Sequence, residues 1–403
     1  MDIRILIVSA VFPPEPIVSA QISENIAVEL VRNHNVTVLC PPPTKPFGYQ
    51  FNNKKSVTKY KVEQMSSFTC PAYNLFGRFR ENYSFGKQCY VYIKKNWSNI
   101  DVIYANTGPL FAQFLAVRIA NKYKIPIIIH IQDIYPESLS NKIPGIGKWV
   151  NIVLRPLDKY VLKNSTSIIA ISEKMKCYLG KTRKIELSKI NVVHNWQDES
   201  AFIQYRQTVT ADNLLKSPFI FMYLGNIGPV AGVELLIDAF VKANFQDVKL
   251  VIAGSGSMKE KLQSKCKSLG NEKIEFWIVP DGKVPEVQSQ ANVLLLPVKR
   301  GASFSSLPSK LPAYMFSAKP IIACVDEQSD IAGFIMQTNC GWIVEPENVD
   351  VLTKKMKEVV TLDELHLTKM GKQGCEYALE HFSREKNVSK VVQIILDTKN
   401  NEK

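Results

Sequence analysis

Short runs of apolar, mostly β-branched residues alternate with amphipathic stretches along almost the whole chain, and this alternation restricts the possible folds. Continuous apolar runs are typical of strands that are buried on both faces, in parallel sheets covered by helices. In the first half the pattern predicts strands at Ile3–Ser9, Val36–Cys40, Val102–Ala105, Ile125–Ile131, Ser167–Ile171 and Ile190–Val193. Helices are expected at Ser19–Arg32, Leu110–Lys122 and Pro156–Lys163. The chain therefore belongs to the α/β class.

The same alternation begins again after a polar segment in the middle of the chain. It predicts further strands at Phe219–Leu224, Lys249–Ala253, Ile274–Trp277, Val293–Leu296 and Pro320–Cys324. A chain of 403 residues is too long for one ordinary core and suits two domains of roughly 150 to 200 residues. We predict a first domain over residues 1–198, a linker over 199–217 and a second domain over 218–382, each with a Rossmann-like, doubly wound sheet.

Two doubly wound sheets in tandem place the carboxyl ends of their strands, where such folds bind ligands, on either side of a central cleft. This arrangement suits an enzyme that joins two substrates. The turn after the first strand is rich in proline and lacks the Gly-x-Gly-x-x-Gly fingerprint of NAD-binding sheets. The sequence also contains no Gly-x-Ser-x-Gly, which argues against a serine hydrolase, and no Asp-x-Asp that could hold a metal-bound diphosphate.

Lysine and arginine exceed aspartate and glutamate by 13, which favours anionic partners such as phosphates or an acidic membrane surface. Nucleic acid is disfavoured, because the basic residues form no dense stripe and no nucleic-acid-binding motif appears. The sequence has no apolar run of about 18 residues and no Cys or His cluster with the spacing of a metal site. We therefore expect a cytoplasmic protein without a bound metal.

The segment from Leu296 to Leu311 is the strongest candidate for a phosphate site. A strand end leads through a basic loop of small residues into a helix start, where free backbone amides and the helix dipole favour an anion. The Lys310 side chain would add a full positive charge. The other candidate donors in this segment are Lys299, Arg300, Ser305, Ser306 and Ser309.

The turn formed by Gly254, Ser255 and Gly256 follows an expected strand and precedes a helix. Its glycines would allow the backbone to approach a diphosphate closely. Lys259 stands where a third fingerprint glycine is expected, and a tight turn with Ser257 as the helix cap explains the segment about as well.

Two strand ends of the first domain carry further candidate residues. The turn through Pro16, Ile17, Val18 and Ser19 opens a helix and could line the cleft, or could be no more than a rigid turn. Farther along, His130, Asp133 and Glu137 follow an Ile-rich strand, which places them at the edge of the sheet. Either His130 or Asp133 is a candidate catalytic residue, although a lone histidine is as often a structural residue.

Several segments together resemble the family 4 glycosyltransferases of the GT-B fold, especially the branch that assembles O-antigen, capsule and colanic-acid-like polysaccharides. The resemblance covers nearly the whole chain and rests on Phe12–Pro16, Gln132–Ser138, Asn195–Trp196, Tyr223–Gly228, Pro308–Leu311 and Lys319–Ala323. It implies two Rossmann-like domains, with the nucleotide sugar on the second domain near Gly225 and Asn226 and the acceptor on the first. It also implies a final helix, residues 383–403, that crosses back to the first domain.

The activity implied by the resemblance is a retaining, metal-independent transfer from a UDP-sugar, carrying a deoxy or N-acetylamino sugar, to a lipid-linked saccharide. The chain departs from the family pattern where many members carry a Glu-x7-Glu pair, because Ser305 and Ala313 occupy those positions. The arginine and lysine that commonly clamp the diphosphate are replaced by Asn226 and Ala231. We therefore expect Lys310, with Lys299 or Arg300, to neutralise the leaving group.

Two other functions remain open from the sequence. An NDP-sugar 2-epimerase would use the same fold without an acceptor, and a catalytically weak scaffold protein would only bind the sugar nucleotide. Peripheral contact with the anionic inner membrane is a further expectation, based on mixed aromatic and basic residues between Tyr73 and Trp97. An ordinary helix whose aromatic side chains pack inward explains that segment equally well.

Overall fold

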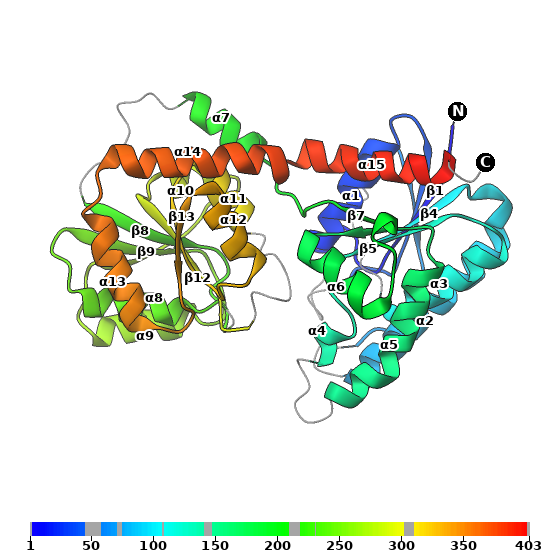
Figure 1. Cartoon of the computed structure of the whole chain (residues 1–403), viewed down its shortest axis with the longest axis horizontal. Coiled ribbons are helices and arrows are strands. Elements are labelled where there is room, and N and C mark those ends of the chain that lie inside the picture. The colour runs from blue at the N-terminus through cyan, green and yellow to red at the C-terminus, as the bar shows by residue number, and fades with distance from the viewer. Residues whose placement is uncertain are drawn as a thin grey trace. The chain divides into compact units, whose positions relative to one another are not determined.

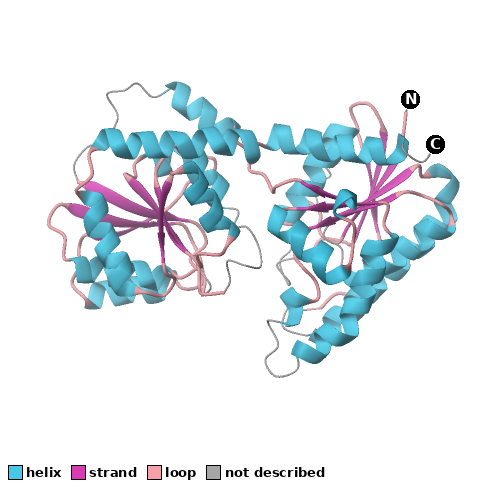
Figure 2. Ribbon diagram, viewed as in Figure 1, coloured by secondary structure: helices cyan, strands magenta, loops and turns pink. Residues whose placement is uncertain are grey.

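The computed structural model describes residues 2–44, 58–70, 75–106, 109–140, 147–208, 218–229, 231–301 and 310–400. The chain folds into two compact units: Met1–His194 together with Asn387–Lys403, and Asn195–Lys386. Figure 1 labels the elements of both units, and Figure 2 shows the strands of each unit at its centre with helices around them. In the described part of the chain, no helix has the length and apolar character needed to cross a membrane.

The first unit contains a parallel sheet. Among the described residues, its strands lie in the order β3-β2-β1-β4-β5-β6-β7. The apolar run of the first strand pairs on both sides, with Ile7 opposite Val38 on one neighbour and Tyr104 on the other. The strands are β1 (Arg4–Ser9), β2 (Asn35–Cys40), β3 (Lys61–Gln64), β4 (Val102–Asn106), β5 (Ile127–Ile131), β6 (Ser167–Ala170) and β7 (Ile190–Val192).

Helices cover this sheet and bury its apolar side chains. α2 and α5 both pack on α3, and α15 at the end of the chain belongs to this unit from Asn387 onward. The helices are α1 (Val18–Leu30), α2 (Leu75–Asn96), α3 (Leu110–Lys122), α4 (Glu137–Ser140), α5 (Gly147–Asn164), α6 (Glu173–Arg183) and α15 (Arg384–Asn400), with short 3-10 turns η1 (Trp97–Asn99) and η2 (Leu187–Lys189).

The second unit repeats this architecture. Its sheet is parallel, with the order β10-β9-β8-β11-β12-β13 in the described residues. Numbered within the unit, this is the 3-2-1-4-5-6 order of doubly wound dinucleotide-binding sheets. The strands are β8 (Phe219–Leu224), β9 (Val248–Ala253), β10 (Ile274–Trp277), β11 (Val293–Pro297), β12 (Ile321–Cys324) and β13 (Gly341–Val344).

The helices of the second unit include several that the sequence pattern did not delimit. They are α7 (Ser200–Thr208), α8 (Val233–Ala243), α9 (Lys259–Ser268), α10 (Val284–Ser289), α11 (Lys310–Phe316), α12 (Asp330–Thr338), α13 (Val349–Val360) and α14 (Glu364–His381). Two predictions need correction. The expected linker contains α7, whose Phe202 is buried in the second core, and Pro156 lies inside α5 rather than at its start. Pro156 is exposed there, so water can satisfy the carbonyl group that its missing N–H leaves unpaired.

Each sheet changes the direction of its strand order at one place, between β1 and β4 in the first unit and between β8 and β11 in the second. Ligands of open α/β sheets bind at the carboxyl ends of the strands beside such a switch point. The residues that follow these strands are therefore the first place to look for a site.

Candidate functional site

In the second unit, the turns after β8 and β9 are joined to one another by backbone hydrogen bonds. The Gly225 amide donates to the Ala253 carbonyl at 3.0 Å, and the Ile227 amide donates to the Ser255 carbonyl at 2.8 Å. The Met258 amide donates back to Ile227 at 3.0 Å, just before α9 begins. These bonds fix both turns as one rigid edge beside the switch point.

Glycine is required in both turns because the two backbones approach so closely. Gly254 has a φ of +129°, and a Cβ atom there would lie 2.2 Å from the Gly225 carbonyl oxygen. A Cβ atom on Gly225 would lie 2.3 Å from Cε of Lys310. A side chain on Gly254 would therefore clash with fixed backbone, whereas at Gly225 it would strain a φ of +154° and displace the Lys310 side chain, so both positions present bare backbone.

Polar hydrogens are available on this edge. Among the described residues, the amides of Ser255 and Gly256 have no hydrogen-bond partner. The Lys259 side chain, on the first residue of α9, donates to the Gly254 carbonyl at 3.0 Å and so holds its ammonium group at the turn. The alternative in which Ser257 caps the helix is wrong, because Met258 is the N-cap and no side chain caps this end.

Lys310, the first residue of α11, extends toward the same edge. Its ammonium group donates a hydrogen bond to the Tyr223 hydroxyl and lies 4.5 Å from the centre of the Tyr223 ring. Tyr223 in turn donates to the Asn226 carbonyl at 2.6 Å. Burial lowers the pKa of Lys310 to about 8, since the surroundings disfavour its charge. This lysine therefore lies at the switch point, in contact with β8 and the glycine turn that follows it.

The loop between β11 and α11 is described only in part. Lys299 is exposed, and Arg300 pairs with Glu345 at 2.9 Å and donates to the Pro346 carbonyl at 3.1 Å. Arg300 is thus already neutralised by an acidic neighbour, which makes it a weaker candidate for a phosphate ligand than Lys310. Ser305, Ser306 and Ser309 lie outside the described residues.

In the first unit, a chain of buried polar side chains joins the ends of β1, β4 and β5. The Asn106 amide donates to the Ser23 hydroxyl at 2.8 Å, and the Gln132 amide lies 3.4 Å from the Asn106 carbonyl oxygen and 3.1 Å from Nε2 of His130. The Tyr104 hydroxyl lies 2.6 Å from Nδ1 of His130. The switch point of this unit is therefore held by a continuous polar network.

His130, one of the two candidate catalytic residues, lies within β5 and is buried, as the structural alternative requires. Its ring is fully buried between Tyr104 and Gln132, and burial lowers its pKa to about 3. This burial follows from the position of His130 within β5, a strand whose residues are all buried, directly opposite Ile169 on β6. This buried imidazole contacts the Gln132 side chain, which fits a structural role for His130. Asp133, just beyond the strand, is exposed.

The turn after β1 is held by an acidic residue that also faces inward. The buried Glu15 carboxylate accepts the Thr44 amide at 2.8 Å and the Phe12 amide at 3.3 Å. The chain then passes through Pro16 and Ile17 and enters α1 at Val18, with Pro16 and Val18 exposed. The Ser19 carbonyl accepts from Asn106 at 3.1 Å, which connects this turn to the buried network.

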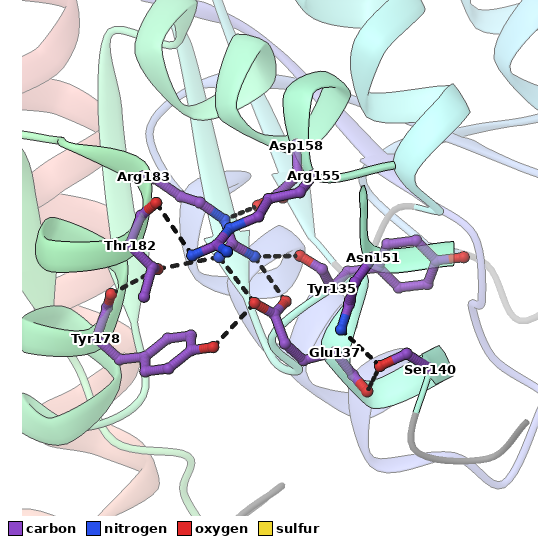
Figure 3. A network of polar contacts seen from close by, with 9 residues as sticks. All are labelled: Tyr135, Glu137, Ser140, Asn151, Arg155, Asp158, Tyr178, Thr182 and Arg183. Atoms are coloured by element: carbon purple, nitrogen blue, oxygen red, sulfur yellow. Dashed lines mark hydrogen bonds and ion pairs between the residues drawn. The ribbon is translucent and has the colours of Figure 1, made fainter. Parts of the chain in front are cut away.

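Glu137 belongs to an ion-pair network, shown in Figure 3, that the sequence did not reveal. The fully buried Arg183 donates to both Glu137 oxygens, at 2.6 and 2.8 Å, and to Asp158 at 2.6 Å. A fourth hydrogen bond from Arg183, 2.9 Å long, reaches the Tyr135 carbonyl. Burial raises the pKa of Asp158 to about 6, whereas Arg183 keeps that of Glu137 below its ordinary value despite burial. The Glu137 carboxylate thus fixes the segment that follows Asp133.

Sequence reasoning left out Asn106, Tyr314 and Lys259 as site residues. Asn106 ends the apolar run of β4, which is the position where a ligand or a supporting residue is expected. Tyr314 follows Lys310 by one helical turn, so it lies on the same face of α11, and its hydroxyl binds the backbone of Leu224 at the end of β8. Lys259 was considered only as a missing glycine.

Comparison with known proteins shows to which family this chain belongs. The sequence model described as "Glycosyltransferase Family 4" matches residues 21–200, and the model described as "Glycosyl transferases group 1" matches residues 206–377. The chain is 24% identical to the putative colanic acid biosynthesis glycosyl transferase WcaI of Escherichia coli K12 over 354 residues, which cover 82% of this chain and 85% of the relative.

A second relative is an alpha-1,4-N-acetyl-D-galactosaminyltransferase of Campylobacter jejuni, named for a PP-undecaprenol-linked saccharide. It is 24% identical over 375 residues, covering 89% of this chain and 91% of the relative. The crystal structure of HepE from Anabaena in complex with UDP is similar in fold, with a TM-score of 0.71, 15% identity and coverage of 98% and 100% of the two chains. Together, these matches and the two doubly wound units show that the chain is a glycosyltransferase of family 4 with the GT-B fold.

Proposed function

We propose that this glycosyltransferase takes its sugar from a UDP-sugar whose diphosphate binds the second unit at the glycine turns beside Lys310. The main support is that the Lys310 ammonium group, the unpaired Ser255 and Gly256 amides and the bare backbone of the glycine turns meet at the switch point. A diphosphate needs close backbone approach and positive charge, and this edge offers both. The UDP complex of the structurally similar HepE supports the choice of nucleotide.

We further propose that the transfer retains the anomeric configuration and needs no metal ion. The bond between the sugar C1 and the diphosphate oxygen would break as the acceptor oxygen attacks C1 on the same face. The acceptor proton would pass to the departing phosphate, and Lys310 with the Ser255 and Gly256 amides would stabilise the negative charge. Asp133, exposed at the end of β5, is proposed to orient the acceptor hydroxyl.

The proposed acceptor is a saccharide on a lipid diphosphate, in the assembly of a surface polysaccharide such as O-antigen or capsule. The Campylobacter relative named for a PP-undecaprenol saccharide and the colanic acid relative support this class. The positive net charge of the chain also favours work at an anionic membrane. The transferred sugar is proposed to be a deoxy or N-acetylamino sugar.

Thermal unfolding with a panel of nucleotide sugars tests the donor. A ligand present at 100 times its Kd stabilises the native state by about 2.7 kcal/mol, so the true donor should raise the Tm measurably. We expect UDP-sugars to raise the Tm and GDP- and ADP-sugars to do so much less. A larger shift with another base would overturn the UDP assignment.

The chemical proposal is tested with the donor found in that screen. Incubation with undecaprenyl-diphosphate saccharides and excess EDTA should give a lengthened saccharide whose new linkage keeps the donor anomeric configuration, as read by NMR. An inverted linkage or abolition of transfer by EDTA would contradict the mechanism. Release of a free epimerised sugar without acceptor would identify a 2-epimerase, and binding without any turnover would identify a scaffold.

A further inference from the structure

Helix α5 has apolar side chains on two opposite faces. One face packs into the first core through Leu154, Val161 and Leu162, which are all buried. On the other face, Trp149, Ile152 and Val153 are 70%, 64% and 68% exposed. Large apolar side chains in adjacent positions are costly to leave in water, so this second face calls for a partner.

The exposed apolar residues form a continuous stripe. Residues 149, 152 and 153 have the i, i+3, i+4 spacing that places side chains together on one helix face, and exposed Pro156 and Tyr160 continue it. The polar residues of α5 that bind other elements lie elsewhere on the helix. Asn151 donates to Ser140 at 3.0 Å, and Asp158 accepts from Arg183, as Figure 3 shows.

Basic residues flank this stripe. Lys148, Arg155 and Lys163 are exposed, and Lys159 is partly exposed. α5 is described over its whole length, and its single carboxylate, Asp158, is buried and paired with Arg183. The exposed surface of α5 is therefore apolar along its centre and purely basic in charge.

Helix α2, where the sequence suggested a membrane contact, has a different surface. Phe85 is buried, Phe79 packs edge-to-face on Phe111 at 6.0 Å, and Trp97 just beyond the helix stacks on Tyr123 at 5.1 Å. These three aromatic side chains thus pack within the first unit, whereas Tyr83 is 55% exposed and Tyr73 lies outside the described residues. The reading of α2 as an ordinary helix with inward aromatics accounts for them.

The charge pattern distinguishes between two possible partners of the α5 stripe. A second copy of the chain docked by the same face would bring two sets of basic side chains together without an acidic partner, which is unfavourable. The stripe also covers a small area compared with the roughly 800 Å² that each partner usually buries in a stable dimer. An anionic bilayer accepts apolar side chains below its headgroups and attracts lysine and arginine at its surface.

We propose that α5 is the membrane-docking helix of this glycosyltransferase, with Trp149, Ile152 and Val153 inserted among the headgroups of an anionic bilayer. The proposal deepens the proposed function and rests on it for the lipid-linked acceptor. It gives the first unit, where the acceptor is proposed to bind, its own attachment to the membrane. Docking itself requires neither donor nor acceptor.

Vesicle flotation of the full-length protein tests the proposal without any sugar substrate. Wild type should float with vesicles containing phosphatidylglycerol, and much less with pure phosphatidylcholine vesicles or at high salt. The triple variant Trp149→Ser, Ile152→Ser, Val153→Ser should lose binding by at least about tenfold, because three inserted apolar side chains are removed. Lys148→Gln with Lys159→Gln should weaken binding to a similar degree.

Matched controls separate this surface from general stickiness. Leu365→Ser removes an apolar side chain that is 80% exposed on α14 of the second unit, and should float like wild type. Tyr83→Ser with Lys87→Gln changes exposed residues of α2 and should also leave flotation unchanged. The Tm of each variant checks that it is folded, since all the substituted side chains are exposed or partly exposed.

The position of Trp149 provides an independent readout. Brominated lipids should quench part of the wild-type fluorescence, and Trp149→Phe should remove that part while keeping flotation. Full flotation of the triple variant, or loss of flotation in the α2 variant, would overturn the proposal. Concentration-dependent dimerisation that the triple variant abolishes would instead assign the stripe to a second copy. Because donor-induced Tm shifts and transfer to a detergent-solubilised acceptor do not need docking, failure here leaves the proposed function testable on its own.

Discussion

Lys310 occupies a position where a positive charge is unfavourable until an anion arrives. Its neighbours are the Tyr223 hydroxyl and ring and the Gly225 turn, and among the described residues no carboxylate pairs with its ammonium group. Burial accordingly lowers its pKa. A bound diphosphate would supply the missing charge and raise that pKa again. If the donor diphosphate binds here as proposed, it would stabilise a cation that burial otherwise disfavours.

This environment predicts a pH dependence of donor binding. As pH rises through about 8, the unliganded Lys310 loses its proton, so UDP affinity should fall between about pH 7 and pH 9.5. The stability of the free protein should change with pH in the opposite direction. Between about pH 8 and 10.5 the unfolded chain keeps the Lys310 proton and the folded protein does not, so the free energy of unfolding rises with pH in this range.

The matched variant for the affinity measurement is Lys310→Arg, which keeps its charge at all these pH values. Its UDP affinity, measured by calorimetry across the same range, should be nearly independent of pH even if it is weaker overall. The same pH profile in both proteins would mean that another group titrates.

Arg183 presents the reverse case, a buried cation already paired by two carboxylates. Replacing Arg183 with Gln leaves Glu137 and Asp158 without their partner, and should lower the free energy of unfolding by about 3–5 kcal/mol. Lys283→Ala breaks an exposed pair with Glu286 and should change it little. Urea denaturation compares the two, and a small loss for Arg183→Gln would show that water or rearrangement replaces the guanidinium.

The paired turns after β8 and β9 have the most tightly fixed backbone of the proposed donor site. Their glycines do not provide flexibility, because the crossing hydrogen bonds fix both backbones. They allow the backbones to approach within a distance that any Cβ atom would prevent. The rigidity of this edge is what keeps the proposed phosphate donors in place before the donor binds.

Gly254→Ala should therefore lower the free energy of unfolding by about 3 kcal/mol, because it combines an unfavourable φ with a backbone clash. Gly333→Ala is the control, since Gly333 lies within α12 and an added methyl group meets nothing within 4 Å. That change should stabilise the protein by about 0.5–1 kcal/mol. Equal effects of the two substitutions in urea denaturation would show that the turn is not so tightly packed.

The strands with long apolar runs could be predicted from the sequence, but shorter elements could not. The strand β3 carries Lys61 and Glu63 and is mostly exposed, so it lacks the apolar signal of the central strands. The helix predicted from Pro156 begins at Gly147 instead, because exposure allows a proline inside α5. Local patterns do not contain the information that decided these two cases.

Site residues that a local sequence pattern marks could be predicted, whereas those set by contacts with distant residues were found only in the structure. Lys310 and Gly254 were predicted because strand ends of doubly wound sheets are visible in the sequence. The burial of His130 and the pairing of Glu137 with Arg183 depend on residues 26 and 46 positions away in the chain. Such contacts between distant segments leave no mark in a single sequence.

Taken over the full chain, the two units use one architecture in two ways. The switch point of the second unit carries bare backbone and lysine, which suit a phosphate, whereas that of the first carries a buried network of neutral polar groups from Ser9 to Tyr104. The chain crosses between the units twice, and both crossings meet in the second unit, where Glu199 accepts from Ser383 and from the Arg384 amide. The proposed assignment of the donor to the second unit and the acceptor to the first therefore rests on the strand ends, since the two sheets are alike.

Calorimetric titration of wild type and Lys310→Ala, each with UDP and with uridine, is the decisive experiment for the donor site. Uridine lacks the diphosphate, so both proteins should bind it equally. UDP should bind the variant more weakly by at least about tenfold, or about 1.4 kcal/mol, because a charge-assisted contact to phosphate is lost. Equal UDP affinity in the two proteins would contradict the placement of the diphosphate at Lys310.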